Sequence, residues 1–177
     1  MNLWHEIPSG KNLPEIINVI VEIPKGSKNK YEIDKETGLI KLDRAMKTAQ
    51  DYPFDYGFVP QTLWEDGDAL DVILLTTNPL FPGILVEARP VAVIHMIDGG
   101  EGDDKVIAVP KNDPRWEGVK DLEDINPHTI KEIQHFLETY KTIEGKSVVI
   151  NGIEGCEAAH AAVIKSLALY QEKFPQN

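Results

Sequence analysis

Three aspartates lie within six positions of one another in the stretch from Trp64 to Thr76, WEDGDALDVILLT. They are Asp66, Asp68 and Asp71, and the apolar run 72–75 follows them at once. Hard divalent cations such as Mg²⁺ prefer carboxylate oxygens in such a cluster and would remove the repulsion between three like charges. A solvated acidic hairpin is the alternative, and it would be favoured for a bare Asp-x-Asp. The third acid, at the mouth of a buried strand, favours a metal site.

Further acids lie near the ends of predicted strands, with bases and phenols interleaved between them. The acids are Glu22, Glu32, Asp98 and Asp103, and the bases and phenols are Lys30, Arg44, Tyr52, Tyr56, Lys105, Tyr140 and Lys141. Each alone has an ordinary explanation, because neighbouring Lys and Glu residues usually form a surface ion pair. Together they predict a cavity with cation-binding carboxylates on one wall and phosphate donors on the other. Phosphoryl transfer needs that combination.

Two familiar motifs fail to fit the chain. An EF-hand loop that starts at Asp66 would have Leu70 at an oxygen-donor position and Thr77 at the position of its last Glu, so a calcium sensor fits poorly. The sequence Gly-Lys-Ser at 145–147 resembles the end of a P-loop, but Tyr140 stands where the earlier glycine is required.

Composition limits the other classes of function. The chain has 177 residues, 42% of them hydrophobic and 27% charged, which predicts one soluble domain with a sizeable core. Its 29 acids and 18 bases give a formal net charge of −11, so we expect it to repel nucleic acid and anionic lipid. Cys156 is the only cysteine, which excludes an intrachain disulfide and a thiolate cluster, and we expect it to pack. Without a signal-peptide pattern or a long apolar run, the protein is expected in the cytoplasm.

These residues must be positioned by a β-rich part of the chain and a helical part that follows it. Apolar and β-branched runs predict strands at residues 16–23, 31–34, 39–42, 72–75, 84–97 and 105–109, the first three as a β-meander. Short strands with Gly/Pro turns indicate a small barrel or sandwich. A change to three- and four-residue spacing predicts helices at roughly 126–143 and 154–173. We therefore expect a β-barrel with two C-terminal helices.

Strand geometry links some of the candidate side chains directly. Lys30 and Glu32 differ by two positions and should point the same way. Asp66 and Asp68 should also share a face, whereas Asp71 has the wrong spacing to join them in an extended chain. We predict that the backbone bends in this loop and brings the third carboxylate to the other two.

Several short motifs contain the candidate residues. They are Asp66-Gly-Asp68-Ala-Leu-Asp71, Glu-Ile-Pro at 22–24, Lys-Tyr-Glu-Ile-Asp at 30–34, Asp-Arg at 43–44, Tyr-Pro at 52–53, Asp-Tyr-Gly at 55–57, Asp98, Asp103, Lys105 and Tyr140-Lys141. Together they resemble the family I soluble inorganic pyrophosphatases of the prokaryotic type, whose signature is Asp-x-Asp followed by a third Asp. The resemblance runs from the N-terminal arm to the second predicted helix. Ala69 departs from it, because family members more often have Pro or Glu there, and the loop 98–103 is glycine-rich.

The resemblance implies roles for the residues. Five carboxylates would bind Mg²⁺, namely Asp66, Asp71, Asp103, Asp98 and Glu32. The first three would bind the tightest ion, with Asp71 bridging to a second. Asp68 would be the general base, acting on a water held between two metals. Six side chains would hold the two phosphates, namely Lys30, Arg44, Tyr56, Lys105, Tyr140 and Lys141. Glu22 and Tyr52 would support the site.

The same resemblance implies the fold and the reaction. The fold is α+β, mainly β, with a closed five-stranded OB-like β-barrel at roughly 16–110 in a single domain over 1–177. The reaction is hydrolysis of pyrophosphate, bound as its Mg complex, to two orthophosphates by direct attack of water. Other divalent cations are alternative cofactors, and a homohexamer is expected, with the alanine-rich second helix as a packing surface. A non-catalytic β-barrel that binds oligonucleotide or metal is the alternative, and a net charge of −11 weighs against it.

Overall fold

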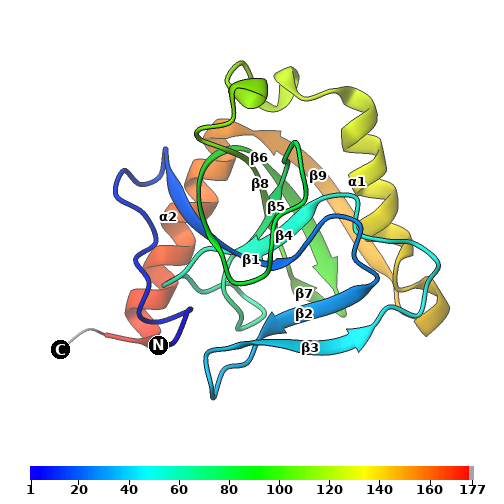
Figure 1. Ribbon diagram of the computed structural model, residues 1–177, viewed down its shortest axis with the longest axis horizontal. Coiled ribbons are helices and arrows are strands. Elements are labelled where there is room, and N and C mark those ends of the chain that lie inside the picture. The colour runs from blue at the N-terminus through cyan, green and yellow to red at the C-terminus, as the bar shows by residue number, and fades with distance from the viewer. Residues whose placement is uncertain (176–177) are drawn as a thin grey trace.

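The computed structural model describes residues 1–175, and a set of β-strands with two α-helices makes up the fold (Figure 1). The strands are β1 (Ile17–Ile23), β2 (Asn29–Ile33), β3 (Ile40–Ala45), β4 (Asp55–Phe58), β5 (Asp71–Leu74), β6 (Leu85–Asp98), β7 (Glu101–Gly102), β8 (Lys105–Pro110) and β9 (Val148–Gly155). The α-helices are α1 (Pro127–Thr139) and α2 (Cys156–Lys173), and short 3₁₀ turns occupy Pro114–Trp116, Leu122–Asp124 and Thr142–Glu144.

Five strands close a ring. Hydrogen-bonded neighbours follow the order β1-β4-β5-β8-β6, and β6 pairs again with β1. The pairs in the ring are antiparallel except for β5 with β8, which is parallel. Strands β7 and β9 add to β6, and the β2–β3 hairpin forms a separate two-stranded sheet. The predicted fold class, a five-stranded β-barrel with two C-terminal helices, is confirmed.

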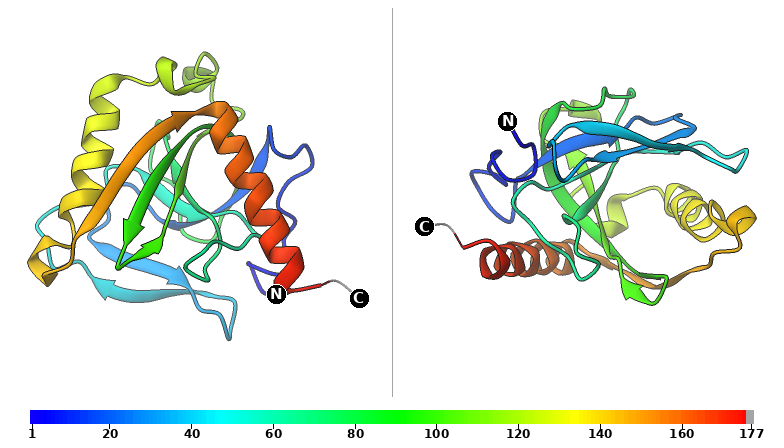
Figure 2. Two further views of the ribbon diagram at one scale, coloured as in Figure 1. Left: turned by 180° about the vertical axis from the view of Figure 1, so that it is seen from behind. Right: turned by 90° about the horizontal axis from the view of Figure 1, so that it is seen from below.

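The predicted opening β-meander is wrong. Strand β1 pairs with β4 and β6, and β2 pairs only with β3. All seven residues of β1 are buried, whereas those of β2 are half-buried. A strand that is buried on both faces gains most by lying inside the ring, and a half-buried hairpin packs beside it. Figure 2 shows this hairpin on the side of the barrel away from β9.

The C-terminal part contains a strand that the sequence does not predict. Strand β9 pairs with β6 and runs between α1 and α2 (Figure 2). Its apolar run is short and is interrupted by Asn151 and Gly152, so it carries little strand signal. The first helix ends at Thr139, before the predicted boundary at 143, and the second begins at Cys156.

Helix α1 begins where the sequence places it. The side chain of Asn126 accepts a hydrogen bond of 2.9 Å from the backbone N–H of His128, and Pro127 occupies the first turn, where its missing N–H is not needed. The helix buries Ile133, Phe136 and Leu137. Its apolar stripe is therefore turned toward the barrel.

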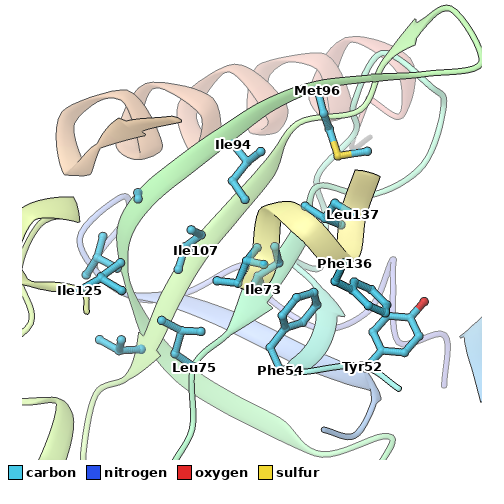
Figure 3. Close-up of a cluster of buried hydrophobic side chains, with 14 of the residues drawn as sticks. Tyr52, Phe54, Ile73, Leu75, Ile94, Met96, Ile107, Ile125, Phe136 and Leu137 are labelled. Atoms are coloured by element: carbon cyan, nitrogen blue, oxygen red, sulfur yellow. The ribbon is translucent and has the colours of Figure 1, made fainter. Parts of the chain in front are cut away.

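Alternate residues of the ring strands belong to two different apolar clusters. One cluster joins strand residues to α1 and includes Ile73, Ile94, Ile107, Phe136 and Leu137 (Figure 3). The other joins the neighbours of those strand residues to α2 and includes Val72, Val93, Val106, Ala159 and Val163. Because side chains alternate along a strand, the ring is buried on both of its faces. This explains the continuous apolar runs in the sequence.

A substitution at Gly57 in β4 tests how closely β4 packs against β1 in the ring. A Cβ at this position would lie 2.0 Å from the carbonyl oxygen of Ile20 in β1, so the backbone would have to move. We expect Gly57→Ala to lower the free energy of unfolding in urea by about 3 kcal/mol. Gly152→Ala is the matched control, because Gly152 also lies in a strand and its Cβ would meet nothing within 4 Å. Equal losses in the two variants would contradict this account.

Candidate active site

The parallel pairing of β5 with β8 brings two acidic loops together. Strand β5 begins at Asp71, directly after the loop that holds Asp66 and Asp68, and β8 begins at Lys105, directly after the loop 99–104. Asp71 and Lys105 are opposite each other in the register. Because parallel strands start at the same edge of a sheet, both loops meet at that edge. Residues far apart in the sequence are thereby gathered around one point.

Lys105 lies between two carboxylates at this point. Its Nζ donates to Asp71 Oδ2 at 2.7 Å and to Asp103 Oδ1 at 2.8 Å, and the residue is only 3% exposed. Burial acts to lower the pKa of Lys105, but the charges of Asp71 and Asp103 outweigh it, so that pKa is raised. Burial also raises the pKa of Asp103 to about 7, against the opposing effect of Lys105. The ammonium compensates the two carboxylates only in part.

The predicted bend in the acidic loop is present. Gly67 has a φ of 84°, a left-handed conformation that glycine adopts without strain. The backbone N–H of Trp64 donates to Asp68 O at 2.7 Å, and the N–H of Asp68 donates to Asp66 Oδ1 at 3.0 Å. The turn leaves the Asp68 carboxylate exposed, whereas burial raises the pKa of Asp66.

The acidic loops, β4 and α1 enclose a cavity of about 170 Å³. It is lined by most of the predicted site residues, namely Lys30, Tyr52, Tyr56, Asp66, Asp68, Asp71, Asp98, Asp103, Lys105, Tyr140 and Lys141, together with Phe136 and Leu137. Carboxylates, ammonium groups and phenols thus face one small space. Figure 3 shows Tyr52, from the segment between β3 and β4, next to Phe136 of α1.

A second cavity of about 290 Å³ adjoins the first and extends over the β2–β3 hairpin. The two cavities share Lys30, Tyr56, Asp68 and Asp71. Predicted residues that line only the second are Glu22 and Glu32. We call the first the acidic cavity and the second the hairpin cavity. Asp68 lies at their junction.

The hairpin cavity holds the predicted Lys30–Glu32 neighbours. Lys30 Nζ donates to Glu32 Oε2 at 2.9 Å, which confirms that the two side chains point the same way. Glu22 lies deeper, where its Oε1 accepts the backbone N–H of Ile33 at 2.7 Å. Burial, followed by the charge of Asp71, raises the pKa of Glu22 to about 8. Glu22 therefore ties β1 to the hairpin and leaves a carboxyl group inside the cavity.

Arg44 does not line either cavity. It lies at the end of β3, paired with Asp43, and its Nε is 3.7 Å from Glu144 Oε1. This Nε is buried and has no hydrogen-bond partner among the described residues. A buried donor without an acceptor is costly, and an incoming anion would satisfy it.

An aromatic wall closes the side of the acidic cavity next to α1. The ring centroids of Tyr52 and Tyr56 are 6.0 Å apart, and Tyr140 stacks on Phe136 at 5.0 Å. Burial and the charge of Asp71 raise the pKa of Tyr56 well above its usual value, so its phenol keeps its proton. Phe54, like Phe58, is fully buried, as the core interpretation of these residues expects.

Two residues at the site escaped the sequence analysis. Lys35 forms an ion pair with Asp68, and its Nζ also lies 5.8 Å from the Trp4 ring centroid. Nothing local signals this contact, because it depends on where the hairpin docks. Asp43 Oδ2 lies 3.6 Å from Lys30 Nζ. A regular hairpin would not predict that contact, because Lys30 is opposite Arg44 and Tyr31 is opposite Leu42, which leaves Asp43 unpaired at a bulge.

The donor set at the acidic cavity fits a hard divalent cation. In the part of the chain that the structure describes, no three Asp, Glu, His or Cys side chains converge closely enough to hold a metal ion, and Lys105 Nζ lies between two of the carboxylates. The acidic side chains that line the cavity are all aspartates, which suit Mg²⁺ or Mn²⁺. Burial, and to a lesser extent the charge of Asp71, raises the pKa values of Asp66 and Asp103, and a bound cation would favour their charged forms.

Comparisons with known proteins agree with one another. A family model described as "Inorganic pyrophosphatase" matches residues 19–171. The inorganic pyrophosphatase of Haloferax volcanii is 47% identical over 175 residues, 98% of this chain and 99% of that protein. Soluble inorganic pyrophosphatase 3 of Arabidopsis thaliana is 47% identical over 169 residues, 96% of this chain and 78% of the relative. The crystal structure of inorganic pyrophosphatase from Thermus thermophilus superposes with a TM-score of 0.93 at 45% identity, covering 97% of this chain and 99% of that one.

Replacing Lys105 tests the charge balance of the cavity. We expect Lys105→Met to lower the free energy of unfolding by about 3 kcal/mol in the absence of divalent cations, because two poorly solvated carboxylates lose their partner. Added Mg²⁺ should restore part of that loss. Lys111→Met is the control, since Lys111 pairs with Glu87 at 3.3 Å on the surface and should contribute little. Urea denaturation with and without Mg²⁺ measures both, and a Lys105→Met variant as stable as the parent would refute the compensation.

Proposed function

The chain belongs to the inorganic pyrophosphatase family and hydrolyses pyrophosphate to two orthophosphates with the help of divalent cations; we propose that the reaction is a direct attack of water in the acidic cavity. One observation carries this proposal. The parallel register sets Asp71 opposite Lys105, so carboxylates for cations and donors for phosphate face the same small space. Hydrolysis of a phosphoanhydride requires both, because negative charge must be neutralised on the attacking and leaving sides.

Three carboxylates are suited to hold the tightest cation. Asp66, Asp71 and Asp103 line the acidic cavity and come from the two loops that meet there. Asp98 lies across the same cavity, paired with Lys141, and Glu32 lies in the hairpin cavity, so these two would serve further cations. We propose Mg²⁺ as the physiological ion. When bound, it supplies Lewis acidity, which lowers the pKa of water and neutralises phosphate oxygens.

Asp68 is suited to the role of general base. It is exposed, unlike the half-buried aspartates around it, and it lies where the acidic and hairpin cavities meet. Its carboxylate is paired with Lys35 rather than with Lys105. An exposed ion pair of this kind is weak, so Lys35 can release Asp68 to accept a proton from water.

Six side chains would bind the two phosphates, namely Lys30, Arg44, Tyr56, Lys105, Tyr140 and Lys141. Arg44 offers its unsatisfied buried Nε, and Tyr56 keeps a phenolic proton to donate. Lys105 already lies between two carboxylates, and its ammonium would be available to a phosphate oxygen if cations neutralised those acids. Tyr52 and Glu22 support this wall of the site from buried positions.

Direct attack is supported by the residues around the acidic cavity. The side chains that line it include no Ser, Cys or His. Covalent catalysis by an aspartate would need one carboxylate to leave its cation and become a nucleophile, which the crowding of charges disfavours. Water activated at Asp68 is the simpler nucleophile.

An Asp68→Asn variant tests the assignment of the base. We expect it to lose at least about two orders of magnitude in phosphate release from pyrophosphate with Mg²⁺, because the amide cannot accept the proton. Its affinity for Mg²⁺, measured by calorimetry, should change little. The control is Asp51→Asn, which alters an exposed carboxylate that lines neither cavity. Near-normal turnover in Asp68→Asn would exclude this residue as the base.

We also propose a homohexamer, on the family resemblance. On α2, Ala159 and Ala162 are buried within the chain, whereas Ala161, Ile164 and Ala168 are exposed and remain available to pack against another chain. Exposed apolar side chains also occur at Phe81 and Leu85, near the start of β6. Among the described residues no helix is long and apolar enough to cross a membrane. The cytoplasmic location stays a prediction.

Sedimentation velocity tests the assembly. We expect one boundary at the mass of six chains across micromolar concentrations, because a hexamer would cover the exposed apolar side chains. A monomer boundary at every concentration would contradict the proposed assembly without affecting the proposed chemistry.

A further inference from the structure

The link between β7 and β8 is an interruption within one continuous register. Ile97 of β6 lies opposite Gly102 of β7, and Ile94 of β6 lies opposite Lys105 of β8. Between these two pairs lie His95 and Met96 on β6 and residues 103–104 on the link. Because the two segments have the same length, neither strand carries an inserted residue. Regular pairing is nevertheless lost at residues 103–104, which include the predicted metal ligand Asp103.

A side chain replaces one of the missing backbone acceptors. The N–H of Asp103 still donates to Met96 O at 2.9 Å, as in an antiparallel ladder. The N–H of Met96, however, donates to the carboxylate of Asp104, at 3.3 Å from Oδ1. The Asp104 side chain is thus part of the strand pairing at the interruption.

His95 binds the other oxygen of the same carboxylate. Its Nδ1 lies 2.7 Å from Asp104 Oδ2. A carboxylate can only accept, so Nδ1 carries the hydrogen. Asp104 is 17% exposed and His95 33%, so this bond is partly shielded from water. On the other side of the imidazole of His95, Nε2 lies 3.3 Å from Glu154 Oε1 in β9, without the geometry of a hydrogen bond.

We propose that His95 is a positioning residue for the cation site: by holding Asp104, it fixes the interruption that presents Asp103 to the acidic cavity. The inference rests on the proposed function, in which Asp103 binds a divalent cation. Asp103 and Lys105 flank Asp104 in the chain, and both face the cavity, whereas the Asp104 side chain is bound to His95 outside it. Anchoring the middle residue limits the movement of both neighbours. His95 itself does not line the acidic cavity.

Calorimetric titration of the full chain with MgCl₂, in the absence of pyrophosphate, tests this role. We expect His95→Leu to weaken Mg²⁺ binding about tenfold, the lower range for residues that orient a metal ligand. His95→Asn should recover most of the affinity, because its amide nitrogen replaces Nδ1 as the donor to Asp104. His95→Gln, which places its amide near the Nε2 position, should not recover it. The thermal unfolding temperature of each variant confirms that it is folded.

A second substitution keeps the test independent of any one variant. Asp104→Ala should weaken Mg²⁺ binding at least as much as His95→Leu, because it removes the acceptor of the Met96 N–H as well as that of His95. The double variant should bind Mg²⁺ no more weakly than Asp104→Ala alone, since both substitutions remove the His95–Asp104 bond. Glu154→Gln is the control, because it changes the neighbour of Nε2 and leaves the bond from Nδ1 to Asp104 intact. It should bind Mg²⁺ like the parent. Parent-like affinity in His95→Leu or Asp104→Ala, or no rescue by His95→Asn, would overturn the inference. If the parent chain bound no Mg²⁺, the proposed metal site itself would fail instead.

Discussion

The parallel pairing of β5 with β8 is the constraint on which the site depends. In an antiparallel pair the two preceding loops would lie at opposite edges of the sheet, and the acids of 66–71 would never meet Asp103. The parallel register instead places Asp71 beside Lys105 and gathers two acidic loops at one edge. The rest of the ring, with α1 packed against one of its faces, holds this pair in place.

The site also depends on compensation of the charges of its carboxylates by Lys105. Without cations, Lys105 bridges Asp71 and Asp103, and burial keeps the pKa values of Asp66 and Asp103 raised. In the mechanism that we propose, a divalent cation would replace Lys105 as the partner of these carboxylates and would leave the lysine available to phosphate. Asp68 stands outside this balance, with Lys35 as its partner. The three aspartates of one short loop thus have different surroundings, in keeping with the different roles that we propose for them.

The sequence predicts which side chains come together better than it predicts the strand pairing. Residue types and short spacings indicate most of the residues that line the acidic cavity, the bend at Gly67 and the shared direction of Lys30 and Glu32. They cannot indicate that β1 pairs with β6 in the ring rather than with β2, or that β9 pairs with β6, because those pairings depend on burial of whole strands. The Lys35–Asp68 contact escapes for the same reason. Long-range register carries no signal in any single segment.

A crystal structure of the chain soaked with Mn²⁺ and phosphate tests the central claim most directly, because anomalous scattering locates the cations. We expect a strong peak within coordination distance of Asp66, Asp71 and Asp103, with Lys105 Nζ turned from the carboxylates toward a phosphate oxygen. Cations bound only outside the acidic cavity, with Lys105 still between Asp71 and Asp103, would contradict the account.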